Sequence, residues 1–133
     1  MLWFILLIFF SIINNIFIFL KVNLRWPTEL SINPLDGSLH ILDDHLVLRV
    51  TPDNRLKVVA GRSLQCPAQT NANVREKSDL ATDVYLESPQ SIAFAPNGDL
   101  YIAESDSQTV NRVRVIGSDG RISRFDASIY YVI

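Results

Sequence analysis

The stretch SPQSIAFAPNGDLYIAE, residues 88–104, decides the fold because an earlier part of the chain repeats it. WPTELSINPLDGSLHILD, residues 26–43, can be laid over it with one extra residue, which aligns their prolines and their final carboxylates. The segments that follow, 46–61 and 111–127, match as well. A unit of about forty residues that occurs twice is typical of a propeller or solenoid, in which each unit buries its apolar faces against neighbours.

Each copy is predicted to fold as four short antiparallel strands, which make one blade of a β-propeller. The turns Asp36-Gly37 and Asn97-Gly98 supply the positive φ that a tight hairpin requires. The expected strands are 30–32, 39–42, 47–50 and 56–60 in the first copy, and 92–94, 100–103, 112–116 and 121–125 in the second. The predicted fold class is therefore all-β, with about two four-stranded blades of an incomplete propeller.

The two ends of the chain do not follow the repeat. Residues 1–20 are uncharged and almost entirely apolar, so the sequence predicts an N-terminal hydrophobic helix. A stretch of this length can span a bilayer, so the segment is either a membrane anchor, translated non-coding DNA or a cleaved signal peptide. Because propellers close with several blades, we expect the chain to be a fragment. The expected organisation is 1–21 hydrophobic segment, 25–61 first blade, 62–87 inter-blade insert, 88–127 second blade and 128–133 truncated end.

The polar insert 62–87 is predicted to be a long inter-blade loop, either a partner-binding loop or a spacer. Binding by a propeller relies on strands that hold variable loops, so candidate protein-binding residues are taken from the loops. They are Asp44, His45, Arg62, Gln65, Gln69, Ser105 and Gln108. The single cysteine, Cys66, is either one half of a disulfide to sequence outside this chain or a buried free thiol.

No catalytic residue, cofactor or metal site is predicted. His40 falls within a strand. His45 follows two carboxylates and could bind a metal with them, but a short polar turn of this kind is also ordinary in a β-hairpin. Asp43 and Glu104 occupy equivalent positions, which favours a repeated structural task such as hydrogen bonding at a turn. With 12 basic and 14 acidic residues and a net charge of −2, the chain offers no basic surface for nucleic acid.

Strand alternation predicts which side chains pack between the blades. Arg112 and Arg114 should share one face of their strand, either solvated or in ion pairs between blades. Trp26 is interpreted as packing at the entry of the first blade, with an exposed recognition residue as the alternative. The expected core is Leu30, Ile32, Leu39, Ile41, Val47, Val58, Ile92, Phe94, Leu100, Ile102, Val113 and Ile122.

The repeats resemble NHL repeats, and the chain from residue 25 onward resembles the NHL propeller of the teneurins. The matching stretches are RWPTELSINPLDGSLHILD (25–43), VVAGRSLQC (58–66), LESPQSIAFAPNGDLYIAESD (86–106) and NRVRVIGSDGRIS (111–123). The resemblance implies a non-catalytic, extracellular protein-binding module of a large single-pass plasma-membrane protein. That protein would act in cell adhesion, signalling and neuronal development.

The resemblance implies protein partners, which are either another copy of the protein in homophilic contacts or an adhesion receptor. Membrane attachment through residues 1–20 is expected only if that segment is real. Teneurins carry their own span far upstream of the propeller, so the segment does not match it. Two alternatives remain open. One is an NHL-propeller enzyme of lactonase or lyase type, and the other is an intracellular NHL scaffold.

Overall fold

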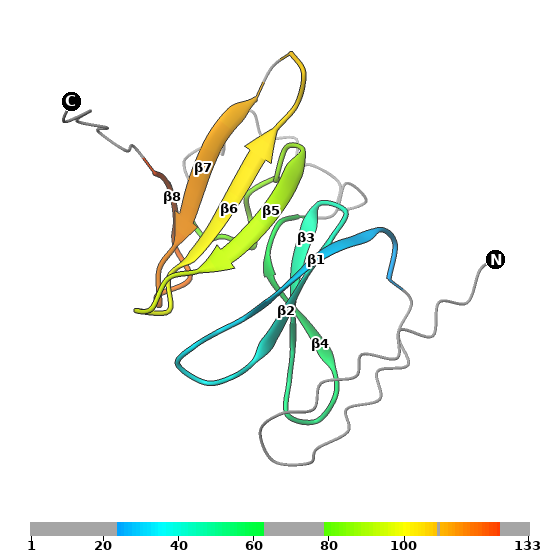
Figure 1. Ribbon diagram of the computed structural model, residues 1–133, viewed down its shortest axis with the longest axis vertical. Helices are drawn as coiled ribbons and strands as arrows, with labels where there is room; N and C mark the ends of the chain where they lie inside the picture. Colours follow the sequence, from blue (N-terminus) through cyan, green and yellow to red (C-terminus); the bar gives the residue numbers. More distant parts are fainter. Residues whose placement is uncertain (1–23, 63–78, 109, 126–133) are drawn as a thin grey trace, which may run out of the picture.

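The computed structural model describes residues 24–62, 79–108 and 110–125, which form two four-stranded antiparallel sheets (Figure 1). Sheet 1 contains β1 (Pro27–Ile32), β2 (Leu39–Asp43), β3 (Leu46–Val50) and β4 (Leu56–Ala60). Sheet 2 contains β5 (Pro89–Phe94), β6 (Leu100–Ser105), β7 (Asn111–Ile116) and β8 (Ile122–Arg124). The all-β prediction and the two four-stranded units are thus confirmed.

The predicted hydrophobic helix lies outside the described residues. The described segments contain no helix, and so none that is long and apolar enough to cross a membrane.

The sequence repeat is also a repeat of strand register. Pro27 pairs with Asp43 in sheet 1 and Pro89 with Glu104 in sheet 2, and in both sheets the register shifts just after the proline. The β1–β2 and β5–β6 turns each contain a glycine with positive φ, 69° at Gly37 and 87° at Gly98. Both glycines adopt a backbone conformation that L side chains rarely take, so the predicted turn chemistry is correct.

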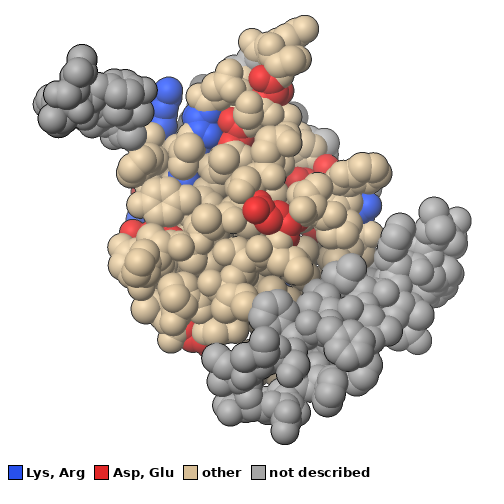
Figure 2. All heavy atoms as spheres, viewed as in Figure 1, with Lys and Arg blue, Asp and Glu red and all other residues tan. Residues whose placement is uncertain are grey.

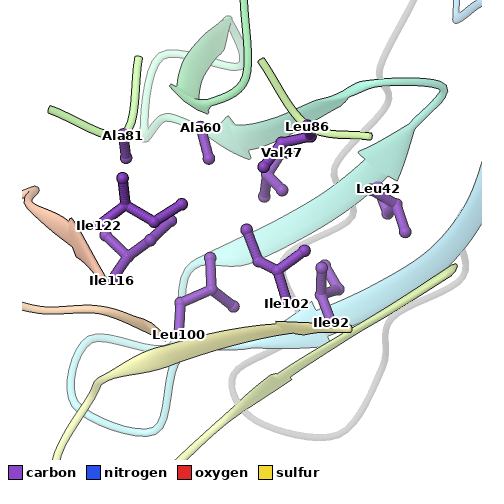
Figure 3. Packing of buried hydrophobic residues seen from close by; sticks show 10 residues of the cluster. All are labelled: Leu42, Val47, Ala60, Ala81, Leu86, Ile92, Leu100, Ile102, Ile116 and Ile122. Carbon is purple, nitrogen blue, oxygen red and sulfur yellow. The ribbon is translucent and has the colours of Figure 1, made fainter. Parts of the chain in front are cut away.

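Each sheet has two different faces. We call the side that carries Leu39 and Ile41, or Leu100 and Ile102, the leading face, and the opposite side the trailing face. The trailing face of sheet 1 packs on the leading face of sheet 2, and their side chains point at one another (Figure 3). The cluster contains Leu42, Val47, Ala60, Ala81, Leu86, Ile92, Leu100, Ile102, Ile116 and Ile122.

Part of the predicted core is wrong. Leu30, Ile32 and Val58 are 43%, 40% and 38% exposed because they lie on the leading face of sheet 1, away from sheet 2. A smaller cluster of Ile41, Leu48 and Val50 forms on that face. Period-2 alternation separates the two faces of a strand, but it does not say which face a neighbour covers.

Trp26 also departs from the expected packing, because it is 71% exposed. Its backbone, rather than its ring, holds the entry of the first sheet. The alternative interpretation of Trp26 as an exposed residue is the one that its surroundings support.

The last nine residues of the insert, 79–87, join the two sheets. Leu80 forms a bridge with Arg121, and the N–H groups of Ala81 and Gly61 donate to the carbonyls of Gly120 and Ala81. Ala81 and Leu86 are both buried in the main cluster. We call residues 79–87 the strap, because they connect the edge of sheet 2 to the end of β4.

Candidate partner-binding end of the two sheets

One end of the two sheets collects the described candidate residues. Strands β2, β4 and β6 all finish there, since alternate strands of an antiparallel sheet run in the same direction. Asp44 and His45 lie in the β2–β3 turn, Arg62 follows β4, and Ser105 and Gln108 end β6 and enter the β6–β7 turn. Gln65, Gln69 and Cys66 lie outside the described residues. We call this end of the molecule the turn end.

Asp43 and Glu104 perform the same structural task in their two sheets. The N–H groups of Arg25 and Trp26 donate to the Asp43 carboxylate at 3.0 and 2.6 Å. The N–H of Glu87, which is equivalent to Arg25, donates to Glu104 at 2.5 Å. Each buried carboxylate therefore ties the chain entering a sheet to the end of its second strand, as their equivalent positions predict.

Glu104 also lies in an ion-pair cluster that sheet 1 lacks. Its side chain is fully buried and accepts from Arg112 Nε at 2.7 Å and Arg114 Nε at 2.6 Å, which confirms that both arginines share one face. The hydrogen bond to Glu104 raises the pKa of Arg112, whereas burial lowers the pKa of Arg114. Arg114 in addition donates to the carbonyl of Tyr85, so the cluster fixes the strap.

His45 joins the β2–β3 turn to the strap. Its Nδ1 lies 2.9 Å from the carbonyl oxygen of Leu86, and its ring stacks on Tyr85 with centroids 5.2 Å apart. Because a carbonyl can only accept, Nδ1 must carry the proton of this hydrogen bond. Its Nε2 is 3.3 Å from Asp44, whose carboxylate also lies 3.6 Å from Arg25. This turn is consequently held in one conformation.

The β6–β7 turn is longer and is built on Asp106. Its carboxylate accepts the N–H groups of Gln108 at 2.8 Å and Val110 at 3.0 Å, while the Ser105 hydroxyl donates to Asn111 at 2.8 Å. Val110 is buried, whereas Ser105 and Gln108 are exposed. Asp106 therefore fixes the described backbone on both sides of this turn, and the two candidate side chains Ser105 and Gln108 are exposed there.

Of the two described histidines, His40 packs between the sheets, whereas His45 contacts the strap. His40 lies on the trailing face of sheet 1 with its ring edge-on to Phe94, 4.7 Å between centroids, and burial lowers its pKa. Within residues 24–62, 79–108 and 110–125, no group of three or more His, Cys, Asp or Glu side chains is placed to hold a metal ion. The face shown in Figure 2 scatters basic and acidic side chains over a mostly uncharged surface.

Sequence reasoning missed Arg25 and Tyr85 at the turn end, and it gave Trp26 as an exposed recognition residue only as the alternative. Trp26 and Arg25 are exposed beside Asp44, and Tyr85 stacks on His45 from the strap. The exposure of Trp26 has a signal in the sequence, because the equivalent position of the second copy is a small polar Ser88 that no core would require. The role of Tyr85 has no such signal, since the strap has no counterpart in the repeat.

Two tandem four-stranded sheets, related by a sequence repeat and packed trailing face on leading face, define consecutive blades of a β-propeller. The family model described as the Teneurin NHL domain matches residues 11–129. The chain is 57% identical over 105 residues to Teneurin-m of Drosophila melanogaster, which covers 79% of this chain. Over 103 residues, or 77% of the chain, it is 40% identical to human Teneurin-4 and 39% identical to Teneurin-3 of Danio rerio.

The chain belongs to the teneurin family. It spans about 4% of the length of these curated relatives.

Proposed function

We propose that this chain is a non-catalytic, extracellular protein-binding part of a teneurin-like cell-surface protein that acts in adhesion and signalling. Family membership supports this proposal, and the observation that carries it is the arrangement of the turn end. There, two turns fixed by buried or hydrogen-bonded carboxylates present Trp26, Arg25, Ser105 and Gln108 to solvent. Exposed aromatic and arginine side chains on a rigid support are the usual anchors of protein interfaces.

The partner is proposed to be a protein, either another copy of the parent molecule or an adhesion receptor. The turn end mixes the cations Arg25 and Arg112 with the anions Asp44 and Glu87, so it carries both signs. A mixed surface of this kind suits a protein partner, whereas nucleic acid would require a predominantly basic one. Localisation at the plasma membrane, with the propeller outside the cell, is part of the same proposal.

The test compares two exposed apolar residues at opposite ends of the sheets. Beads coated with the purified chain are mixed with cells that display a full teneurin ectodomain, and bound beads are counted for Trp26→Ala and Leu35→Ala. These residues are 71% and 66% exposed, and Leu35 lies in the β1–β2 turn at the far end. We expect at least a tenfold loss of binding for Trp26→Ala and none for Leu35→Ala.

Equal binding by the two variants would reject the turn end as the interface. Absence of binding by the unchanged chain, to cells bearing either the ectodomain or an adhesion receptor, would reject the proposed function.

A further inference from the structure

The β5–β6 turn contains Asn97-Gly98, and Asn97 is the only asparagine of the chain that a glycine follows. The fold requires this glycine, because its φ is 87° and an added Cβ would lie 2.5 Å from the side chain of Leu35 in the β1–β2 turn. The backbone nitrogen that follows an asparagine lies within reach of the carboxamide carbon, and glycine has no Cβ to obstruct their approach. The turn therefore keeps a chemically reactive pair.

The turn holds the Asn97 carboxamide through Asp99. Nδ2 of Asn97 donates to the Asp99 carboxylate at 2.8 Å, and Oδ1 accepts the N–H of Asp99 at 3.1 Å. The N–H of Gly98 donates to the carbonyl of Ala95 at 2.9 Å. Because the Asp99 carboxylate can only accept, this turn requires a donor at position 97, which a carboxamide provides and a carboxylate does not.

The equivalent turn of sheet 1 is built for a carboxylate. Counted back from the first residue of the second strand, Asp36 stands in the position of Asn97 and Ser38 in that of Asp99. The Asp36 carboxylate accepts from the N–H and the hydroxyl of Ser38 at 2.9 and 2.6 Å, and from Arg49 at 2.9 Å. The hydrogen bond from the Ser38 hydroxyl is the main cause that lowers the pKa of Asp36, so the charged form is favoured there.

A carboxylate at position 97 would lack both of these supports. Asp99 would face it with a charge of the same sign instead of a hydroxyl, and Val115 stands in the position of Arg49. Conversion of the Asn97 carboxamide to a carboxylate would therefore replace a hydrogen bond by a repulsion at the tip of the β5–β6 hairpin.

We propose that Asn97 is a site of spontaneous deamidation and that the carboxylate produced there loosens the β5–β6 hairpin. The Gly98 nitrogen gives its proton to hydroxide and attacks Cγ of Asn97, so that a new N–C bond forms while the Cγ–Nδ2 bond breaks. Nδ2 takes up a proton from water and leaves as ammonia, and a succinimide ring remains. Water then opens this ring at one carbonyl to give aspartate, or at the other to give isoaspartate, whose main chain is longer by a methylene group.

The reaction takes place within one turn and consumes only water. It needs no partner, and it does not depend on which faces of the two sheets are covered. The turn lies at the end of the sheets opposite to the turn end, so the proposal is independent of the proposed function.

The first test locates the product by peptide mass spectrometry, after the 133-residue chain has been incubated at mildly alkaline pH. Asn54 is the matched control, because it is an exposed asparagine in the β3–β4 turn at the same end and is followed by Arg55. We expect deamidation to be about tenfold faster at Asn97 than at Asn54, since the Arg55 side chain obstructs the attack. The products at Asn97 should include isoaspartate, which a direct hydrolysis of the carboxamide does not form.

The second test measures hydrogen exchange of the N–H groups of Ala95 and Gly98, both of which form hydrogen bonds within the turn. In Asn97→Asp these groups should exchange about two- to tenfold faster, which corresponds to the loss of about one hydrogen bond. Asn54→Asp adds the same charge to a neighbouring turn and should leave them unchanged. The double variant Asn97→Asp, Asp99→Ser reproduces the carboxylate and hydroxyl of the β1–β2 turn and should restore slow exchange.

Three results would overturn the proposal. The first is deamidation at Asn97 that is no faster than at Asn54. The second is unchanged hydrogen exchange in Asn97→Asp. The third is a double variant that exchanges as fast as Asn97→Asp alone, because the loosening would then not arise from the pair of carboxylates.

Discussion

Replacing Glu104 by glutamine should destabilise the protein far more than the loss of one surface ion pair. The Glu104 side chain is fully buried, and it accepts from Arg112, from Arg114 and from the backbone N–H of Glu87. Glutamine keeps the shape but removes the charge, which leaves Arg114, 11% exposed, without its anion. Removing one partner of a buried ion pair costs about 3–5 kcal/mol. Since Arg112 is 26% exposed and can be partly rehydrated, we expect about 3 kcal/mol.

The assay is urea unfolding followed by circular dichroism. With a slope of about 1–3 kcal/mol per M urea, a loss of about 3 kcal/mol lowers the midpoint by about 1–3 M. Asp119→Asn is the matched control, because its carboxylate lies 3.8 Å from Arg121 and both side chains are more than half exposed. Such a pair contributes at most about 1 kcal/mol. If Glu104→Gln unfolds at the same urea concentration as Asp119→Asn, Glu104 does not anchor the entry of sheet 2.

Three further changes probe other parts of the fold by the same urea assay. Gly61→Ala should lower the free energy of unfolding by more than about 2 kcal/mol, because φ is 90° and the added Cβ would lie 2.1 Å from a carbonyl oxygen of the β2–β3 turn. Gly37→Ala is the control, since open space surrounds Gly37, and it should cost only about 1 kcal/mol. Equal costs for the two variants would contradict the clash at Gly61. Leu86→Ala should cost about 2–5 kcal/mol if the strap completes the core, whereas a change below about 1 kcal/mol would show that the strap is peripheral. Burial lowers the pKa of His40 from its ordinary value near 6.5, so its neutral form is favoured in the folded state and stability should fall as the pH drops below about 6.5. His40→Tyr introduces the residue found at the equivalent position Tyr101, and it should reduce the loss of stability between about pH 7.5 and 5. An unchanged dependence of stability on pH would exclude His40 as the source of that loss.

The repeat allowed most of the local fold to be predicted from sequence. Strand positions, hairpin turns and the shared task of Asp43 and Glu104 all follow from residue types that recur at fixed offsets. Repetition is informative here because the two copies adopt the same backbone conformation. Glycine and carboxylate residues therefore recur at the equivalent positions that this conformation requires.

Features without a second copy could not be predicted. The strap has no counterpart in the repeat, and the burial of Leu86 arises from contacts between distant parts of the chain. The exposure of Leu30 and Val58 depends on which face has a neighbour, which periodicity does not encode. At the candidate site, Asp44 and His45 lie in one turn and their role in binding stays a prediction, whereas the contacts of His45 with the strap depend on tertiary packing.

The strap also has a consequence for synthesis on the ribosome. The main apolar cluster needs Ala81, whose N–H bonds to Gly120, and Ile122 of the last strand. About sixty residues separate the end of β4 at Ala60 from Ile122, which corresponds to about 3–12 s of translation at 5–20 residues per second. During that interval the main cluster is incomplete, and the nascent chain presents part of its apolar surface, to which a chaperone can bind.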